Sequence, residues 1–159
     1  MEDPLSYLWG SVIIGILIFL SAFFSASETA LTSVSRHKLR NLARKKEEQE
    51  EQNEIHIFNQ LLTALLISNN LVNILASSIA AVMLSQLIVK ESIATIVSTF
   101  LMTFLLLVFG EITPKILSRQ NSERFFEISM RVIVPLSKLL TPLVTFFVKI
   151  SNYFVRLFG

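Results

Sequence analysis

The sequence predicts an all-α integral membrane domain of three transmembrane helices, with amphipathic juxtamembrane helices forming a belt on the cytoplasmic side. Hydrophobic residues make up 52% of the 159 residues, which is more than a soluble domain of this size needs. Three long uncharged runs begin at Leu5, Leu61 and Ile93. About twenty apolar residues in a helix cross a hydrocarbon core of roughly 30 Å. The predicted spans cover about residues 5–34, 61–88 and 93–113.

The first span is expected to stay in the mature protein. The residues before it, MEDP, are acidic and contain no basic region or small-residue cleavage pattern, so they do not look like a removable signal peptide. The second and third spans are separated only by the short polar link Lys90-Glu91-Ser92. We therefore expect these two spans to form a tight hairpin.

Basic residues are unevenly distributed around the spans. The hairpin link contains Lys90 alone and the N-terminal residues contain none, whereas many follow the first and third spans. Because basic flanks stay on the cytoplasmic side, we expect a multi-pass protein of the plasma membrane with its N-terminus outside and its C-terminus in the cytoplasm. The basic residues of these two flanks are Arg36, Lys38, Arg40, Arg44, Lys45, Lys46, Lys115, Arg119 and Arg124.

The cytoplasmic link over residues 35–60 is polar, with a basic half followed by an acidic half. This pattern is typical of a solvated charged helix. We expect a surface helix or helical turns at the inner membrane face, without a chemical role.

The tail over residues 121–158 predicts the belt. On one continuous helix its four basic residues would share a stripe, the pattern of a helix that lies in the membrane surface. Pro135 and Pro142 should bend the tail into pieces. A fourth span is the alternative, but the longest uncharged piece, Leu139–Val148, is too short to cross. The four basic residues are Arg131, Lys138, Lys149 and Arg156.

Several function classes are not expected from this sequence. It contains no cysteine, and His37 and His56 lie in the charged link, which argues against redox and zinc chemistry. The spans contain no Ser-His-Asp, Cys-His or HExxH arrangement. We therefore expect neither an enzyme nor a nucleic-acid partner.

Each predicted span instead contains a cluster of polar residues, and all of them supply oxygen ligands. Without imidazole or thiolate, such a set selects hard cations such as Mg²⁺, Ca²⁺ or Na⁺, and the chemistry alone does not choose among the three. The clusters are Ser21, Ser25 and Glu28 near one stripe of the first helix, Asn69, Asn70 and Asn73 in the second, and Gly110 with Glu111 at the end of the third.

Pro114 makes the third cluster more informative. Its missing N–H would leave the carbonyl of Gly110, four residues earlier, without its usual helical partner. Glu111 lies beside that carbonyl. An unpaired carbonyl and a carboxylate at membrane depth are tolerated where they line a cavity or meet a partner, and a cation would satisfy both.

The alternative interpretation is helix packing. Ser and Asn in membrane spans often only hold helices together, through hydrogen bonds of about 1 kcal/mol, and this interpretation suits Asn69 and Asn73 best. Glu111 is different, because an ionisable residue in a span is a functional candidate by default. It could also pair with Lys115, four residues on.

Three stretches, FFSASETALTSVSRHKL, LLISNNLVNILASSIAAVML and FGEITPKILSRQNSERF, resemble the transmembrane domain of the CNNM/CorC family of magnesium transporters. The resemblance covers essentially the whole chain and implies three spans, a cytoplasmic belt and a homodimer. It also implies a Mg²⁺ site in the inner half of the bundle. The implied ligands are Ser21, Ser25, Asn70, Gly110 and Glu111, and we expect supporting bonds or a gate from Glu28, Asn69, Asn73 and Pro114.

Family members of this kind continue into cytoplasmic CBS domains that bind nucleotide. Residues 1–159 do not contain them, so we expect this chain to be a membrane domain, with ATP acting only through domains outside it. The predicted function is Mg²⁺ export, with coupling to Na⁺ influx suggested by the resemblance. The alternative is a Mg²⁺-sensing membrane scaffold that regulates other transporters without carrying the ion.

Overall fold

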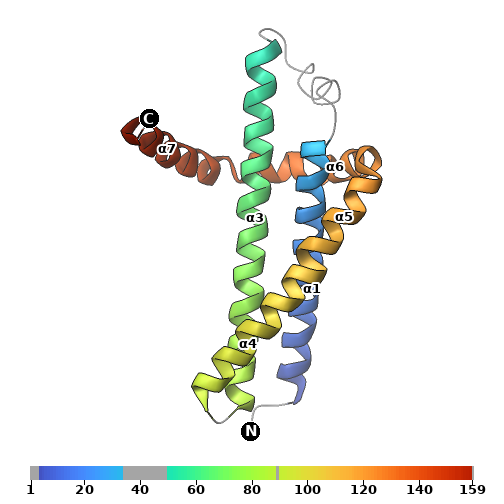
Figure 1. Cartoon of the computed structure of the whole chain (residues 1–159), viewed down its shortest axis with the longest axis vertical. Helices are drawn as coiled ribbons and strands as arrows, with labels where there is room; N and C mark the ends of the chain where they lie inside the picture. The colour runs from blue at the N-terminus through green and yellow to red at the C-terminus, as the bar shows by residue number, and fades with distance from the viewer. Residues whose placement is uncertain (1–3, 34–49, 89, 159) are drawn as a thin grey trace.

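The computed structural model describes residues 4–33, 50–88 and 90–158. Its helices, in chain order, are α1 (Pro4–Ser33), α3 (Glu50–Leu87), α4 (Glu91–Leu105), the π-helix η1 (Leu106–Ile112), α5 (Thr113–Gln120), α6 (Ser122–Leu139) and α7 (Thr141–Phe158). α1 and α3 run roughly along the long axis, the segment from α4 to α5 crosses them obliquely, and α6 and α7 lie across one end (Figure 1). The predicted all-α membrane class is confirmed.

The three candidate spans are Tyr7–Ser33, His56–Leu87 and Glu91–Gln120, with 27, 32 and 30 residues. At 1.5 Å per residue they are about 40 to 48 Å long, which is enough to cross a hydrocarbon core with some tilt. Large apolar side chains cover their outward faces, as at Phe19 and Phe100, which are 73% and 75% exposed. Lipid rather than water is the solvent that suits such faces.

The second span is preceded by more helix than the sequence predicts. α3 begins at Glu50, so residues 50–60 of the predicted link continue the spanning helix instead of forming separate turns on the membrane surface. The first turns of α3 project beyond the level of α6 (Figure 1). Glu and Gln, which open this segment, are good helix formers and prolong the helix outside the apolar region. Residues 34–49 of the link lie outside the described residues.

α4 follows α3 after a short connection over residues 88–90. Lys90 has an extended backbone, with φ −93° and ψ 106°, and its carbonyl accepts a hydrogen bond from the N–H of Ala94 at 3.0 Å. Glu91, predicted as part of the link, is in the first turn of α4, where the helix dipole favours a carboxylate. The two helices contact each other as a hairpin.

The third span changes its helical register in the middle. Residues 106–112 form a π-helix between α4 and α5, and the N–H of Thr113 donates to the carbonyl of Val108, five residues back. Pro114 lies at the start of α5 and has no N–H to close the α-helical bond to Gly110. A π register widens the helix at this point without ending the span.

α6 and α7 form the belt at the end of the bundle (Figure 1). Together they have the length and composition of a span, but they are bent by 74° at the break between them. The prediction that Pro135 would bend the tail is wrong, because α6 continues through it; the break falls at Leu140, just before Pro142. The prediction of a single basic stripe is also wrong, because the break between α6 and α7 places two of the four basic residues on each helix.

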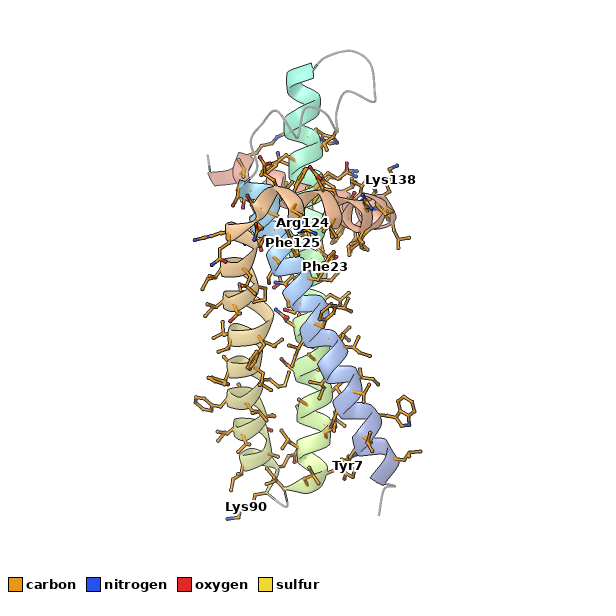
Figure 2. The ribbon with its side chains drawn as sticks, turned by 90° about the vertical axis from the view of Figure 1, so that its right-hand side faces the viewer. Tyr7, Phe23, Lys90, Arg124, Phe125 and Lys138 are labelled. Atoms are coloured by element: carbon orange, nitrogen blue, oxygen red, sulfur yellow. The ribbon has the colours of Figure 1, made fainter. Side chains whose placement is uncertain are left out.

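The belt is attached to the bundle by the apolar face of α6. Phe126, Met130 and Ile133 are buried in a core that α1 and α3 complete with residues such as Phe24 and Leu65. The i, i+4, i+7 spacing places the three α6 residues on one helix face. Arg124 and Lys138 on α6 lie at the opposite end of the bundle from Lys90 and Tyr7, and Phe23 lies close to Phe125 (Figure 2).

Candidate ion-binding site

α1 is the helix on which the candidate site is assembled. One stretch of it carries small residues that are fully buried, among them Ser21, Ser25, Ser27 and Ala30. Small side chains allow helix backbones to approach closely within a membrane. α1 accordingly contacts α3, η1, α5 and α6.

Ser21 lies where the three spans meet. Its Oγ is 3.1 Å from Oδ1 of Asn69 on α3 and 3.3 Å from the carbonyl oxygen of Gly110 on η1. A serine hydroxyl has one proton to donate, so it satisfies only one of these two acceptors at a time. A hydroxyl, an amide oxygen and a backbone carbonyl therefore share one point between the helices, with fewer donors than acceptors.

The absence of a side chain at Gly110 makes this approach possible. A Cβ at this position would lie 2.8 Å from Ser21 Oγ and 3.3 Å from Ser21 Cβ. Gly110 is also buried within the π-helix, a distortion that is frequent at functional sites. The glycine and the π register together present the backbone of the third span to the face of α1.

Two buried oxygen atoms near this point have no hydrogen-bond partner within the described part of the chain. They are Oγ of Ser25 and Oδ1 of Asn73. Each lies one helical turn from a member of the cluster, Ser25 from Ser21 and Asn73 from Asn69. A buried polar atom without a partner costs about 1–3 kcal/mol. A water molecule or a cation between the helices would supply the missing partner.

A charged group lies on the α6 side of this cluster. Nζ of Lys115 on α5 is 3.1 Å from Oε1 of Glu111 on η1 and 3.5 Å from Oε2 of Glu28 on α1. The sequence allows Glu111 to pair with Lys115, four residues on, as an alternative to ion binding, and the structure contains this pair. The contact between Lys115 and Glu28 joins two spans and has no signal in the local sequence.

The two asparagines at positions 69 and 70 take different places. Asn69 is buried and accepts the Ser21 hydrogen bond, whereas Asn70, the residue predicted as a ligand, is exposed in the single chain. Successive residues of a helix point about 100° apart, so the two side chains do not face α1 together. A ligand role for Asn70 stays a prediction.

Ser118 is a polar contact that the sequence reasoning missed. Its Oγ donates to the carbonyl of Ala26 on α1 at 2.6 Å, and the residue is 2% exposed. Ser118 lies beyond the predicted end of the third span, so it was not among the candidates. It holds α5 against α1 at the level of the charged group.

The two sides of the cluster differ in polarity. Toward the Lys90 end, Ala76 and Ala80 pack with Met102, which is 2% exposed, in an apolar core. Toward α6, polar groups continue to the Lys115 ion pairs. Among the residues that the structure describes, no three Asp, Glu, His or Cys side chains gather to hold a metal, so a site here would rely mainly on neutral oxygens.

These features define the class of the protein: a multi-pass α-helical membrane domain with buried oxygen donors at the meeting point of its spans. Residues 12–159 match the family described as the Cyclin M transmembrane N-terminal domain, CNNM, and the chain belongs to this family. It is also similar to a UPF0053 protein of Haemophilus influenzae, with 38% identity over 143 residues. That match covers 89% of this chain and 33% of the relative, so the chain spans about a third of the relative's length.

Proposed function

We propose that this chain is the membrane domain of a Mg²⁺ transporter that exports the ion in exchange for Na⁺ influx. The observation that carries the proposal is the buried Oγ of Ser25, which lacks a partner within the described residues and lies on α1 between Ser21 and Glu28. Family membership supports Mg²⁺ as the cargo, because the oxygen ligands alone suit several hard cations.

The proposed ligands are the hydroxyls of Ser21 and Ser25, the carbonyl of Gly110 and the carboxylate of Glu111. An asparagine of α3 completes the set. The sequence favours Asn70 for this position. The packing favours Asn69, which already contacts Ser21.

The proposed orientation has the N-terminus outside and α6 and α7 at the cytoplasmic face, in the plasma membrane. Basic residues support it: Arg124 and Lys138 lie at the α6 end, and Lys90 at the other (Figure 2). The polar side of the cluster then faces the cytoplasm, and the apolar core around Met102 lies on the outward side. Transport would require this core to separate while the cytoplasmic side closes.

The alternative function is a Mg²⁺-sensing scaffold that binds the ion without carrying it. The same site serves both functions, and ion flux separates them. With either function, we propose that the protein forms a homodimer through its membrane domain. ATP would act through cytoplasmic domains outside this chain.

The first experiment is titration of the purified chain with Mg²⁺ by calorimetry, comparing wild type with Ser25→Ala and Glu111→Ala. Ser25→Ala removes a buried oxygen that has no hydrogen bond to lose, so we expect thermal stability equal to or above that of the ion-free wild type but at least tenfold weaker Mg²⁺ binding. Ser11→Ala and Glu91→Gln are matched controls, because both residues are exposed and distant from the cluster. Unchanged affinity in both site variants would mean that these oxygens only pack the helices.

The second experiment is Mg²⁺ flux in liposomes under an opposing Na⁺ gradient. Na⁺-dependent flux that is lost in Glu111→Ala supports an exporter. Saturable binding without flux under any ion gradient supports the scaffold.

A further inference from the structure

We propose that Lys115 is a tethered cation that bridges Glu111 and Glu28 when no ion is bound and is held by Glu28 alone when an ion occupies Glu111. This inference rests on the proposed function, since it makes Glu111 the shared partner of the ion and the lysine. It assigns to Lys115 and Glu28 a role in setting the affinity of the site.

One ammonium group lies within reach of two carboxylates. Lys115 Nζ lies 3.1 Å from Glu111 and 3.5 Å from Glu28, so it bridges the two and keeps one partner when an ion displaces it from the other. All three side chains are partly shielded, with exposures of 29%, 37% and 24% for Lys115, Glu111 and Glu28. A lysine side chain is flexible and carries a compact charge, which suits such an exchange.

The partner that the ammonium favours depends on whether an ion is bound. Without an ion, the ammonium compensates the carboxylate of Glu111, which would otherwise be costly at membrane depth. When a divalent cation reaches Glu111, it repels the ammonium, and Glu28 provides the nearest alternative acceptor. Repulsion between a divalent ion and an ammonium about 5 Å away changes affinity on the order of tenfold even at the dielectric constant of water.

A transported ion has to leave its site as well as enter it. A cation already on the protein that replaces the departing ion lowers the cost of release. Glu28 and Lys115 come from different helices, α1 and α5, so the pair that keeps the ammonium when an ion takes Glu111 also joins two spans on the α6 side.

The test is calorimetric titration of the whole chain with Mg²⁺ in four variants. Lys115→Gln should bind Mg²⁺ on the order of tenfold more tightly than wild type, because the competing cation is gone. Glu28→Gln should bind more weakly, because Lys115 then has only Glu111. Lys115→Arg, which keeps the charge, should stay close to wild type, and Arg119→Gln, exposed one turn further along α5, is the matched control.

The double variant Lys115→Gln/Glu28→Gln distinguishes two explanations: Glu28 acts by holding Lys115, or Glu28 simply adds a negative charge that attracts the ion. If Glu28 acts through Lys115, Glu28→Gln weakens binding much less in the Lys115→Gln background than in wild type. Equal or larger weakening in that background overturns the proposal, as does unchanged or weaker binding in Lys115→Gln. Damage to the fold would not produce tighter binding, so a gain in affinity is a specific readout. If instead wild type binds no Mg²⁺, or binding does not depend on Glu111, the proposed function itself is wrong.

Discussion

We expect Gly110→Ala to disrupt the meeting point of the three spans. The added Cβ would lie 2.8 Å from Oγ of Ser21 and 3.3 Å from its Cβ. Ser21 is fully buried, so its side chain has little room to move, and moving it costs the contacts to Asn69 and Gly110. Overpacking of a core costs about 1–3 kcal/mol, and interhelical hydrogen bonds in membranes average about 0.6 kcal/mol each. Since Ser21 has one proton to donate, one such bond is lost, and the expected loss in the free energy of unfolding is about 1.5–3.5 kcal/mol relative to a Gly→Ala change at an unobstructed helix position.

The assay is reversible unfolding in mixed micelles, followed by circular dichroism. Gly15→Ala is the matched control, because a Cβ there meets nothing within 4 Å and alanine is the better helix former by about 1 kcal/mol. In a Ser21→Ala background the closest contact is removed, so the loss caused by Gly110→Ala should shrink. Equal stability of Gly110→Ala and Gly15→Ala would refute the close approach of the third span to α1.

Three further changes test other contacts. Ser118→Ala removes the 2.6 Å hydrogen bond to Ala26 and should lower unfolding stability by about 0.5–1.5 kcal/mol; no change would mean that the bond contributes nothing to holding α5. Phe125→Ala removes the ring that lies 6.3 Å from that of Phe23, and hydrogen exchange in α6 should rise while the inner turns of α3 stay protected. Asn69→Ala should weaken Mg²⁺ binding more than Asn70→Ala, because Asn69 is the asparagine that contacts Ser21. The opposite order in the same titration would favour Asn70, the ligand that the sequence predicts.

The contrast between Ser25 and Ser118 illustrates how the structure separates binding from packing. Both hydroxyls are buried, but Ser118 has a short hydrogen bond to a backbone carbonyl and Ser25 has no partner among the described residues. Removing the first should cost stability, and removing the second should cost affinity. The two roles can therefore be read from one pair of Ser→Ala variants.

The sequence by itself determined the membrane class, the three spans and the types of ligand available. Apolar runs of sufficient length are a local property, and in lipid a helix must satisfy its own backbone, so hydropathy alone locates the spans. The resemblance carried by the SASETAL and GEITPK stretches named the family. The missing N–H of Pro114 is also local, and it drew attention to the Gly110 carbonyl, which lies 3.3 Å from Ser21 Oγ.

The tertiary structure decided which side chains face one another. The rotation of α3 about its axis placed Asn69 rather than Asn70 against Ser21, and the packing of α5 on α1 brought Lys115 to Glu28. α6 continues through Pro135, although the sequence predicted a bend there. These outcomes depend on how helices far apart in the chain dock and rotate, and the helical period within any one segment carries no information about that.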